Sequence, residues 1–166
     1  MNMTQPHIDE ILRVFFEHEL EARTGPVTRQ RITRVHQRLL DCLETESEVI
    51  LVGDDRVLLA AEREIQPLGA MARTMHAEDL LFGLDLFLRE PWLDPGSQER
   101  QDQRVQLRLT SALIGMLVTS RLIDRSRCAC PLIDLQARIR SASRGLYPRR
   151  MPESAIPGAE GWRWRT

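Results

Sequence analysis

Lysine is absent from this 166-residue chain, and all 23 of its basic residues are arginine. One interpretation is a genomic bias toward GC-rich codons. The functional interpretation is that the planar guanidinium group pairs with a carboxylate or a phosphate through two hydrogen bonds, which the lysine ammonium group cannot do. Aromatic residues are also scarce, at 5% of the chain, which argues against a large aromatic ligand cage.

Cysteine is rare, and its three copies cannot form a complete set of internal disulfides. This odd number agrees with a reducing compartment. The first ten residues have neither the basic start nor the apolar run of a secretory signal, and no stretch reaches the roughly 20 apolar residues of a membrane span. We therefore expect a cytoplasmic protein without a membrane span.

The usual catalytic and metal-binding motifs are missing. The chain has no glycine-rich phosphate loop, no Gly-x-Ser-x-Gly turn and no His-Glu-x-x-His pattern. Cys128 and Cys130 are closer together than the cysteines of a zinc knuckle, and Cys42 is distant. His76 and Asp79 are compatible with acid–base work or with a helix-capping turn. We expect no catalytic residue, no cofactor and no metal, and the sequence leaves open whether the protein is an enzyme.

Apolar residues recur at spacings of three and four along most of the chain, which predicts amphipathic helices. The sequence favours an all-α fold: a single helical-bundle domain of five or six helices over residues 1–144, followed by a flexible tail rich in Arg, Trp and Pro over residues 145–166. The expected helices span residues 5–22, 26 or 28 to 46, 54–66, 77–90, 98–123 and 131–143, and residues 68–75 form a loop or a short helix.

Residues 49–61 could form two short strands around Gly53, but a helix capped by Asp54 or Asp55 is preferred. This helix is expected to place its apolar side chains inward, namely Val57, Leu58, Ala61 and Ile65. The segment from Leu109 to Ile123 is apolar nearly all round, which predicts a buried central helix.

Charge is distributed unevenly along the chain. Residues 1–100 contain 11 arginines and 19 acids, a formal charge of −8, whereas residues 101–166 contain 12 arginines and 5 acids, a formal charge of +7. The acidic and basic regions can pair within one molecule or between subunits, or the basic region can attract an anionic partner.

The expected second helix has a basic face formed by Arg31, Arg34 and Arg38. These residues are three and four positions apart, so they share one side of the helix, where they could neutralise phosphates. The alternative is a solvated face that forms salt bridges with acids of the first helix, such as Glu17, Glu19 or Glu21.

The carboxyl-terminal third provides a second basic region. Residues 121–150 contain eight arginines and two acids, and we select Arg138, Arg140 and Arg144 as candidate contacts with nucleic acid. Pairing with the acidic first 100 residues is an equal alternative. The final segment alternates Trp162 and Trp164 with arginines, a pattern able to stack on bases or to lie at a membrane surface, although a disordered tail is the simpler interpretation.

The first third also resembles a known family. The sequences FFEHELEAR at 15–23, GPVT at 25–28 and RVHQRLLDCL at 34–43 are similar to the opening of the core-binding, DNA-binding domain of tyrosine recombinases, or phage-type integrases. In that family such helices pack against the DNA backbone. The resemblance covers about Ile8 to Glu44. This chain has Val35 and His36 where such domains often carry an aromatic residue, and it has no recognisable Arg/His/His/Tyr catalytic set. The resemblance therefore implies a binding module without strand cleavage.

Two function classes follow from the sequence. The first is a non-enzymatic interaction or regulatory module that binds a protein partner or itself, as in a homodimer, through apolar residues exposed around Leu86 to Trp92. The second is a DNA-binding accessory protein that uses the arginines of the second helix and of the carboxyl-terminal third. The identity of the partner is not specified by the sequence.

Overall fold

The computed structural model describes residues 6–94, 96 and 98–146, and this part of the chain is all α-helical. It forms one domain, so the predicted fold class is confirmed. Its elements, in chain order, are α1 (Ile8–Glu21), α2 (Pro26–Glu46), the 3₁₀ helix η1 (Ser47–Val49), α3 (Asp54–Ile65), α4 (Ala70–Thr74), α5 (Ala77–Phe87), α6 (Arg100–Thr119) and α7 (Ala129–Leu146). The described residues thus form seven α-helices where five or six were expected. One addition is α4, in the segment expected to be a loop or a short helix.

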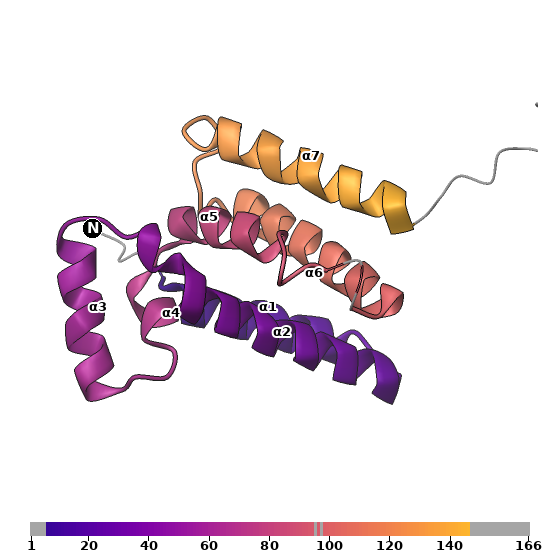
Figure 1. Cartoon of the computed structure of the whole chain (residues 1–166), viewed down its shortest axis with the longest axis horizontal. Helices are drawn as coiled ribbons and strands as arrows, with labels where there is room; N and C mark the ends of the chain where they lie inside the picture. The colour runs from indigo at the N-terminus through magenta and orange to yellow at the C-terminus, as the bar shows by residue number, and fades with distance from the viewer. Residues whose placement is uncertain (1–5, 95, 97, 147–166) are drawn as a thin grey trace, which may run out of the picture.

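The helices are arranged in layers (Figure 1). The α1–α2 hairpin lies on one side, α5 and α6 lie in the middle, and α7 covers the opposite side. Helix α3 stands at one end of the domain, across the direction of the long helices. None of the helices among the described residues combines the length and apolarity needed to cross a membrane.

The α1–α2 hairpin forms as the sequence predicts, with its turn at residues 22–25. Helix α1 buries Ile8, Leu12 and Phe16 against the body of the domain. Its last carbonyls, which have no partner within the helix, are reached from α2, where Arg29 donates a hydrogen bond to the carbonyl oxygen of Leu20 at 2.5 Å. An arginine of the basic second helix therefore serves to join the two helices.

The middle layer holds the centre of the core. Helix α5 buries Leu80, Leu84 and Phe87. Helix α6 buries an apolar stripe that includes Leu109, Leu113 and Leu117, which agrees with the predicted central helix. The aliphatic side chains of both helices remove apolar surface from water, the main favourable contribution to folding.

Helix α6 ends at Thr119, four residues before its predicted end at Ile123. The backbone turns at Arg121, which has a φ of 55°. The amide of Leu122 donates to the carbonyl of Leu117, and the amide of Arg121 donates to that of Val118. These bonds form a Schellman motif, in which a left-handed residue closes the helix. Periodicity missed this end because arginine occupies the position that glycine usually takes.

Residues 49–61, for which the sequence allows two strands or a helix, contain a helix in the structure. Residues 54–65 form α3, and no strand is present among the described residues, whose only bridge joins His7 and His76. At the other end of the chain, α7 continues through Leu146, two residues past residue 144, the expected end of the helical bundle. The rest of the predicted tail, including Trp162 and Trp164, lies outside the described residues.

Candidate functional site: a groove between α5 and α7

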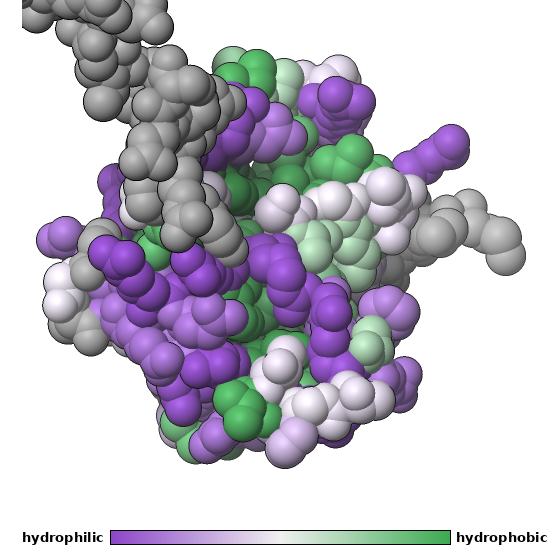
Figure 2. All heavy atoms as spheres, turned by 90° about the vertical axis from the view of Figure 1, so that its right-hand side faces the viewer, coloured by the Kyte–Doolittle hydropathy of each residue, from purple (hydrophilic) through white to green (hydrophobic). Residues whose placement is uncertain are grey.

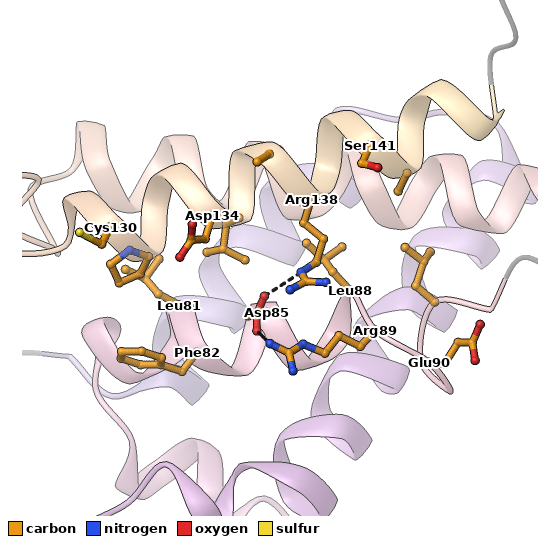
Figure 3. Close-up of a pocket in the computed structure, with 15 residues that line it drawn as sticks. Leu81, Phe82, Asp85, Leu88, Arg89, Glu90, Cys130, Asp134, Arg138 and Ser141 are labelled. Atoms are coloured by element: carbon orange, nitrogen blue, oxygen red, sulfur yellow. Dashed lines mark hydrogen bonds and ion pairs between the residues drawn. The ribbon is translucent and has the colours of Figure 1, made fainter.

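An open groove of about 1050 Å³ runs between α5 and α7 (Figure 3). Residues that line it lie from Cys130 to Ala142 on α7, a rise of about 18 Å at 1.5 Å per residue. Most of its wall is apolar, and Phe82 is 50% exposed at one side. The groove therefore offers apolar contact area over about three helical turns.

The floor of the groove carries an ordered group of charges. One carboxylate oxygen of Asp85 accepts a hydrogen bond from Nε of Arg138 at 2.8 Å, and the other accepts from the guanidinium of Arg89. Figure 3 shows these side chains between the two helices. The acid is mostly covered, so these bonds fix it in place. We call this group the Asp85–Arg138 clamp; it places fixed charges in the groove and links α7 to α5.

The groove exists because α7 buries little of its surface. Its buried residues are Leu132, Leu135 and Leu146, while Ile133 is well exposed. A helix with a narrow apolar stripe packs against its neighbours along that stripe only, so a groove stays open beside it. A smaller groove of about 550 Å³ lies on the α6 side of α7 and includes Ile133 in its lining. Helix α7 is thus the element around which both open surfaces are built.

Part of the predicted interaction segment contributes to this groove. Leu88 and Leu93 line it, but each is mostly buried, and Phe87 lies fully in the core. The expectation that the residues around Leu86 to Trp92 are exposed is therefore wrong for these side chains. Sequence reasoning instead missed Phe82, whose exposure depends on the neighbouring helix.

The basic face predicted on α2 is present, but it points toward α6. Arg31 donates to Asp102 through Nε at 3.1 Å and to Glu99 at 3.1 Å. Arg34 donates to the other oxygen of Asp102, and Arg38 to the carbonyl oxygen of Trp92. The structure brings the three arginines together around groups of the chain itself. A phosphate at this face would have to compete with a covalently tethered carboxylate.

The salt-bridge partners of α2 also differ from those expected. The candidates were acids of the first helix, but Glu19 pairs with Arg108 of α6 at 2.8 Å, and Glu17 pairs with Arg13 of its own helix. The acids that pair with Arg31 and Arg34 lie at the start of α6. A separation of about 70 residues hides this pairing from any local pattern.

A buried polar cluster supports these pairs. The side chains of Asp102, Gln103, Gln106 and Thr110 lie on one buried face of α6. Gln106 donates to the carbonyl oxygens of Phe87, at 2.9 Å, and of Trp92, at 3.2 Å. Because these amide groups satisfy the backbone of the α5–α6 connection, the polar start of α6 has a structural function.

The predicted arginines of α7 have different surroundings. Arg138 belongs to the clamp with Asp85. Arg140 and Arg144 are exposed, one helical turn apart, and neither forms an ion pair within the described part of the chain. Figure 2 shows the end of the domain where α7 stops: hydrophilic residues cover much of this face, and hydrophobic ones are visible in the depth between them.

The histidine and cysteine candidates have structural surroundings. His76 is the N-cap residue of α5, and its backbone amide donates to the Asp79 carboxylate at 3.0 Å, so the capping interpretation of this pair is confirmed. Burial raises the pKa of Cys42 to about 12 and also raises the pKa of Cys128, whereas Cys130 is exposed beside the groove. Residues 6–94 and 98–146 contain no group of three potential metal ligands.

Comparison with models of protein families, with curated proteins and with solved structures finds no match to this chain.

Proposed function

We propose that this protein is a non-enzymatic interaction module that holds a helical segment of a protein partner in the groove between α5 and α7. The observation that carries this proposal is the groove itself. It is lined mostly by apolar atoms, with the half-exposed ring of Phe82 on one wall and the Asp85–Arg138 clamp on its floor. Grooves of this kind accept the apolar face of an amphipathic helix, while a few fixed polar groups set its orientation.

The dimensions of the groove support a helix of about three turns. Its lining along α7 covers about 18 Å, which matches some 12 residues at 1.5 Å per residue. The charges at its edge include Glu90 and Asp134, which form no ion pair within residues 6–94 and 98–146. A partner helix with basic residues beside its apolar stripe would meet these acids.

A site-specific crosslink in the producing cell tests this proposal. A photoreactive phenylalanine analogue at position 82 is expected to give a crosslinked species of defined mass, and the same analogue at the exposed Val27 of α2 is not. Replacing Ala137 in the groove with Glu should remove the crosslink, because it places a charge on the apolar wall. Gln136→Glu is the matched control, since it adds the same charge to α7 outside this groove. Absence of a crosslink at position 82, or equal loss with both variants, would contradict the proposal.

DNA binding is a second candidate function. It is favoured by Arg140 and Arg144, which are exposed and form no ion pair within the described part of the chain. Arg31, Arg34 and Arg38, the basic face expected to neutralise phosphates, already have partners in this chain. If α7 binds phosphates, replacing Arg140 and Arg144 with Ala should reduce the slope of log affinity against log salt by about 2, at roughly 0.9 per phosphate contact. A mobility-shift titration at several salt concentrations measures this slope. An unchanged slope would exclude α7 as the contact.

A further inference from the structure

Helix α3 presents its apolar face to solvent and its charged face to the protein. Val57, Leu58, Ala61 and Ile65 recur at helical spacing and are all exposed, with Ile65 at 82%. Only Leu59 of this helix is buried. In a surface helix the apolar stripe ordinarily faces the core and the charged face meets water. The orientation of α3 is the reverse, so the expectation that these four side chains face the core is wrong.

The charges of α3 explain this orientation. Arg63 pairs with Glu44 and Glu48 of the α2–η1 segment, and Glu62 pairs with Arg73 of α4. These ion pairs lie beside Leu59 on the inner side and fix α3 to the body. The outer apolar face is therefore held outward by contacts on the opposite side, and it does not result from a loosely attached helix.

Neighbouring residues extend the exposed face. Val49 and Val52 precede α3, and Leu68, which is 84% exposed, follows it. Scattered apolar residues are normal on a surface, but exposed apolar residues concentrated in one segment at one end of the domain indicate an interaction site. We call the group formed by Val49, Val52, Val57, Leu58, Ile65 and Leu68 the α3 surface.

Charge indicates what kind of segment covers the α3 surface. Residues 44–73 contain seven acids and three arginines, a formal charge of −4. All three arginines bond to carboxylates or carbonyls of the chain, whereas Glu46, Asp54, Asp55 and Glu64 form no ion pair among the described residues. The acids make a second copy of this face a poor partner, because like charges would meet. A basic, apolar segment fits instead.

We propose that the α3 surface binds the carboxyl-terminal segment of this chain, residues 147–166, with Trp162 and Trp164 as its apolar anchors. This segment contains four arginines and two acids, and Arg163 and Arg165 alternate with the two indoles. The indoles would cover the valine and leucine side chains, and the guanidinium groups would reach the unpaired carboxylates at the rim. Large amphipathic anchors of this type supply much of the binding energy of protein contacts.

The length of the segment allows this contact. Helix α7 is about 27 Å long, and α3 lies beyond its amino-terminal end (Figure 1). Twenty residues extend to at most about 70 Å, so the segment can reach the α3 surface of its own chain or of a second copy. The α5–α7 groove is nearer, but its edge has two acids without an ion pair among the described residues, Glu90 and Asp134, whereas residues 44–73 have four.

Tryptophan fluorescence of the full chain tests this proposal. In a Trp92→Phe background, Trp162 and Trp164 are the only indoles. Their emission should lie at a shorter wavelength, and be less quenched by acrylamide, than that of a synthetic peptide of residues 147–166. Replacing Val57 and Ile65 together with Asp should shift the emission to that of the free peptide. The matched control replaces Val14 and Val27 with Asp, two exposed valines of α1 and α2, and should leave the emission unchanged.

Hydrogen exchange provides a second measurement without the Trp92 substitution. Replacing Trp162 and Trp164 with Ser should increase amide exchange within residues 54–65 and leave that of α5 unchanged. The proposal is overturned if Trp162 and Trp164 of the Trp92→Phe protein emit at the same wavelength as the free peptide. It is also overturned if they remain shielded from acrylamide after Val57 and Ile65 are replaced with Asp. A third contrary result would be that Ala137→Glu exposes Trp162 and Trp164 to acrylamide, because the segment would then occupy the groove. Since the two surfaces are separate, failure here does not affect the groove proposal.

Discussion

Replacing Asp102 with Ala is expected to destabilise the protein by about 2–3 kcal/mol, because this acid joins α6 to α2. Its side chain is 9% exposed and accepts hydrogen bonds from Arg31 and Arg34, whose side chains are 23% and 49% exposed. A hydrogen bond to a charged group contributes about 1.5–3 kcal/mol when it is shielded from water, and this value applies to Arg31. The half-exposed Arg34 adds less than about 1 kcal/mol.

The cost should remain below the roughly 3–5 kcal/mol that follows when one partner of a fully buried ion pair is removed. Both arginines are partly exposed, so they can turn toward solvent once the carboxylate is gone. Urea unfolding followed by circular dichroism measures the effect. With a slope of about 2 kcal/mol per molar, the expected shift of the midpoint is about 1 M.

The exposed pair of Arg13 and Glu17 provides the control, because both of its side chains are 59% exposed. Replacing Glu17 with Ala should cost less than about 0.5 kcal/mol. A double-mutant cycle between Asp102 and Arg31 should give a coupling of about 1–2 kcal/mol. A free energy of unfolding for Asp102→Ala within about 0.5 kcal/mol of the wild type would refute this reasoning. The α2 arginines would then again be candidates for phosphate contacts.

Three further predictions concern single side chains. Arg121→Gly should raise the unfolding free energy by about 1 kcal/mol in the same urea assay, because glycine adopts the left-handed conformation at no steric cost; an unchanged or lower midpoint would count against the Schellman closure. Burial lowers the pKa of His36 below 6.5, so the folded state favours its neutral form, and the stability this provides should be lost as pH falls from about 6.5 toward the lower pKa of the folded state. His36→Leu should flatten that part of the stability–pH curve, and identical curves would exclude the histidine as the cause. Native protein should react with a thiol reagent at Cys130 alone, while Cys42 and Cys128 react only in urea; mass spectrometry after labelling identifies the modified residue.

Local pattern was sufficient for the elements whose signals lie within a few residues. The apolar spacing of Ile8, Leu12 and Phe15 predicts α1, and the Thr24–Gly25–Pro26 turn predicts its end. The apolar period also predicts the helix over residues 54–65, although its N-cap is Gly53 and not Asp54 or Asp55 as expected. These features depend on backbone geometry and on nearest neighbours along the chain, and a sequence records both directly.

Tertiary structure decided the direction in which each face points. The period of α3 shows that Val57, Leu58 and Ile65 share a side, but only the ion pairs of Glu62 and Arg63 with distant residues turn that side outward. The α2 arginines share a face in the sequence, yet whether that face meets solvent or α6 depends on where Asp102 lies.

The groove between α5 and α7 is also a product of tertiary packing. It forms between α5 and α7, whose lining residues are about 50 positions apart, and its opening depends on how little of α7 is buried. The sequence by itself determined the helices and their apolar stripes, since these arise from local periodicity. The docking of one stripe against another, the partner of each charge and the surfaces left uncovered were decided by packing in three dimensions, because those contacts join residues that no local pattern connects.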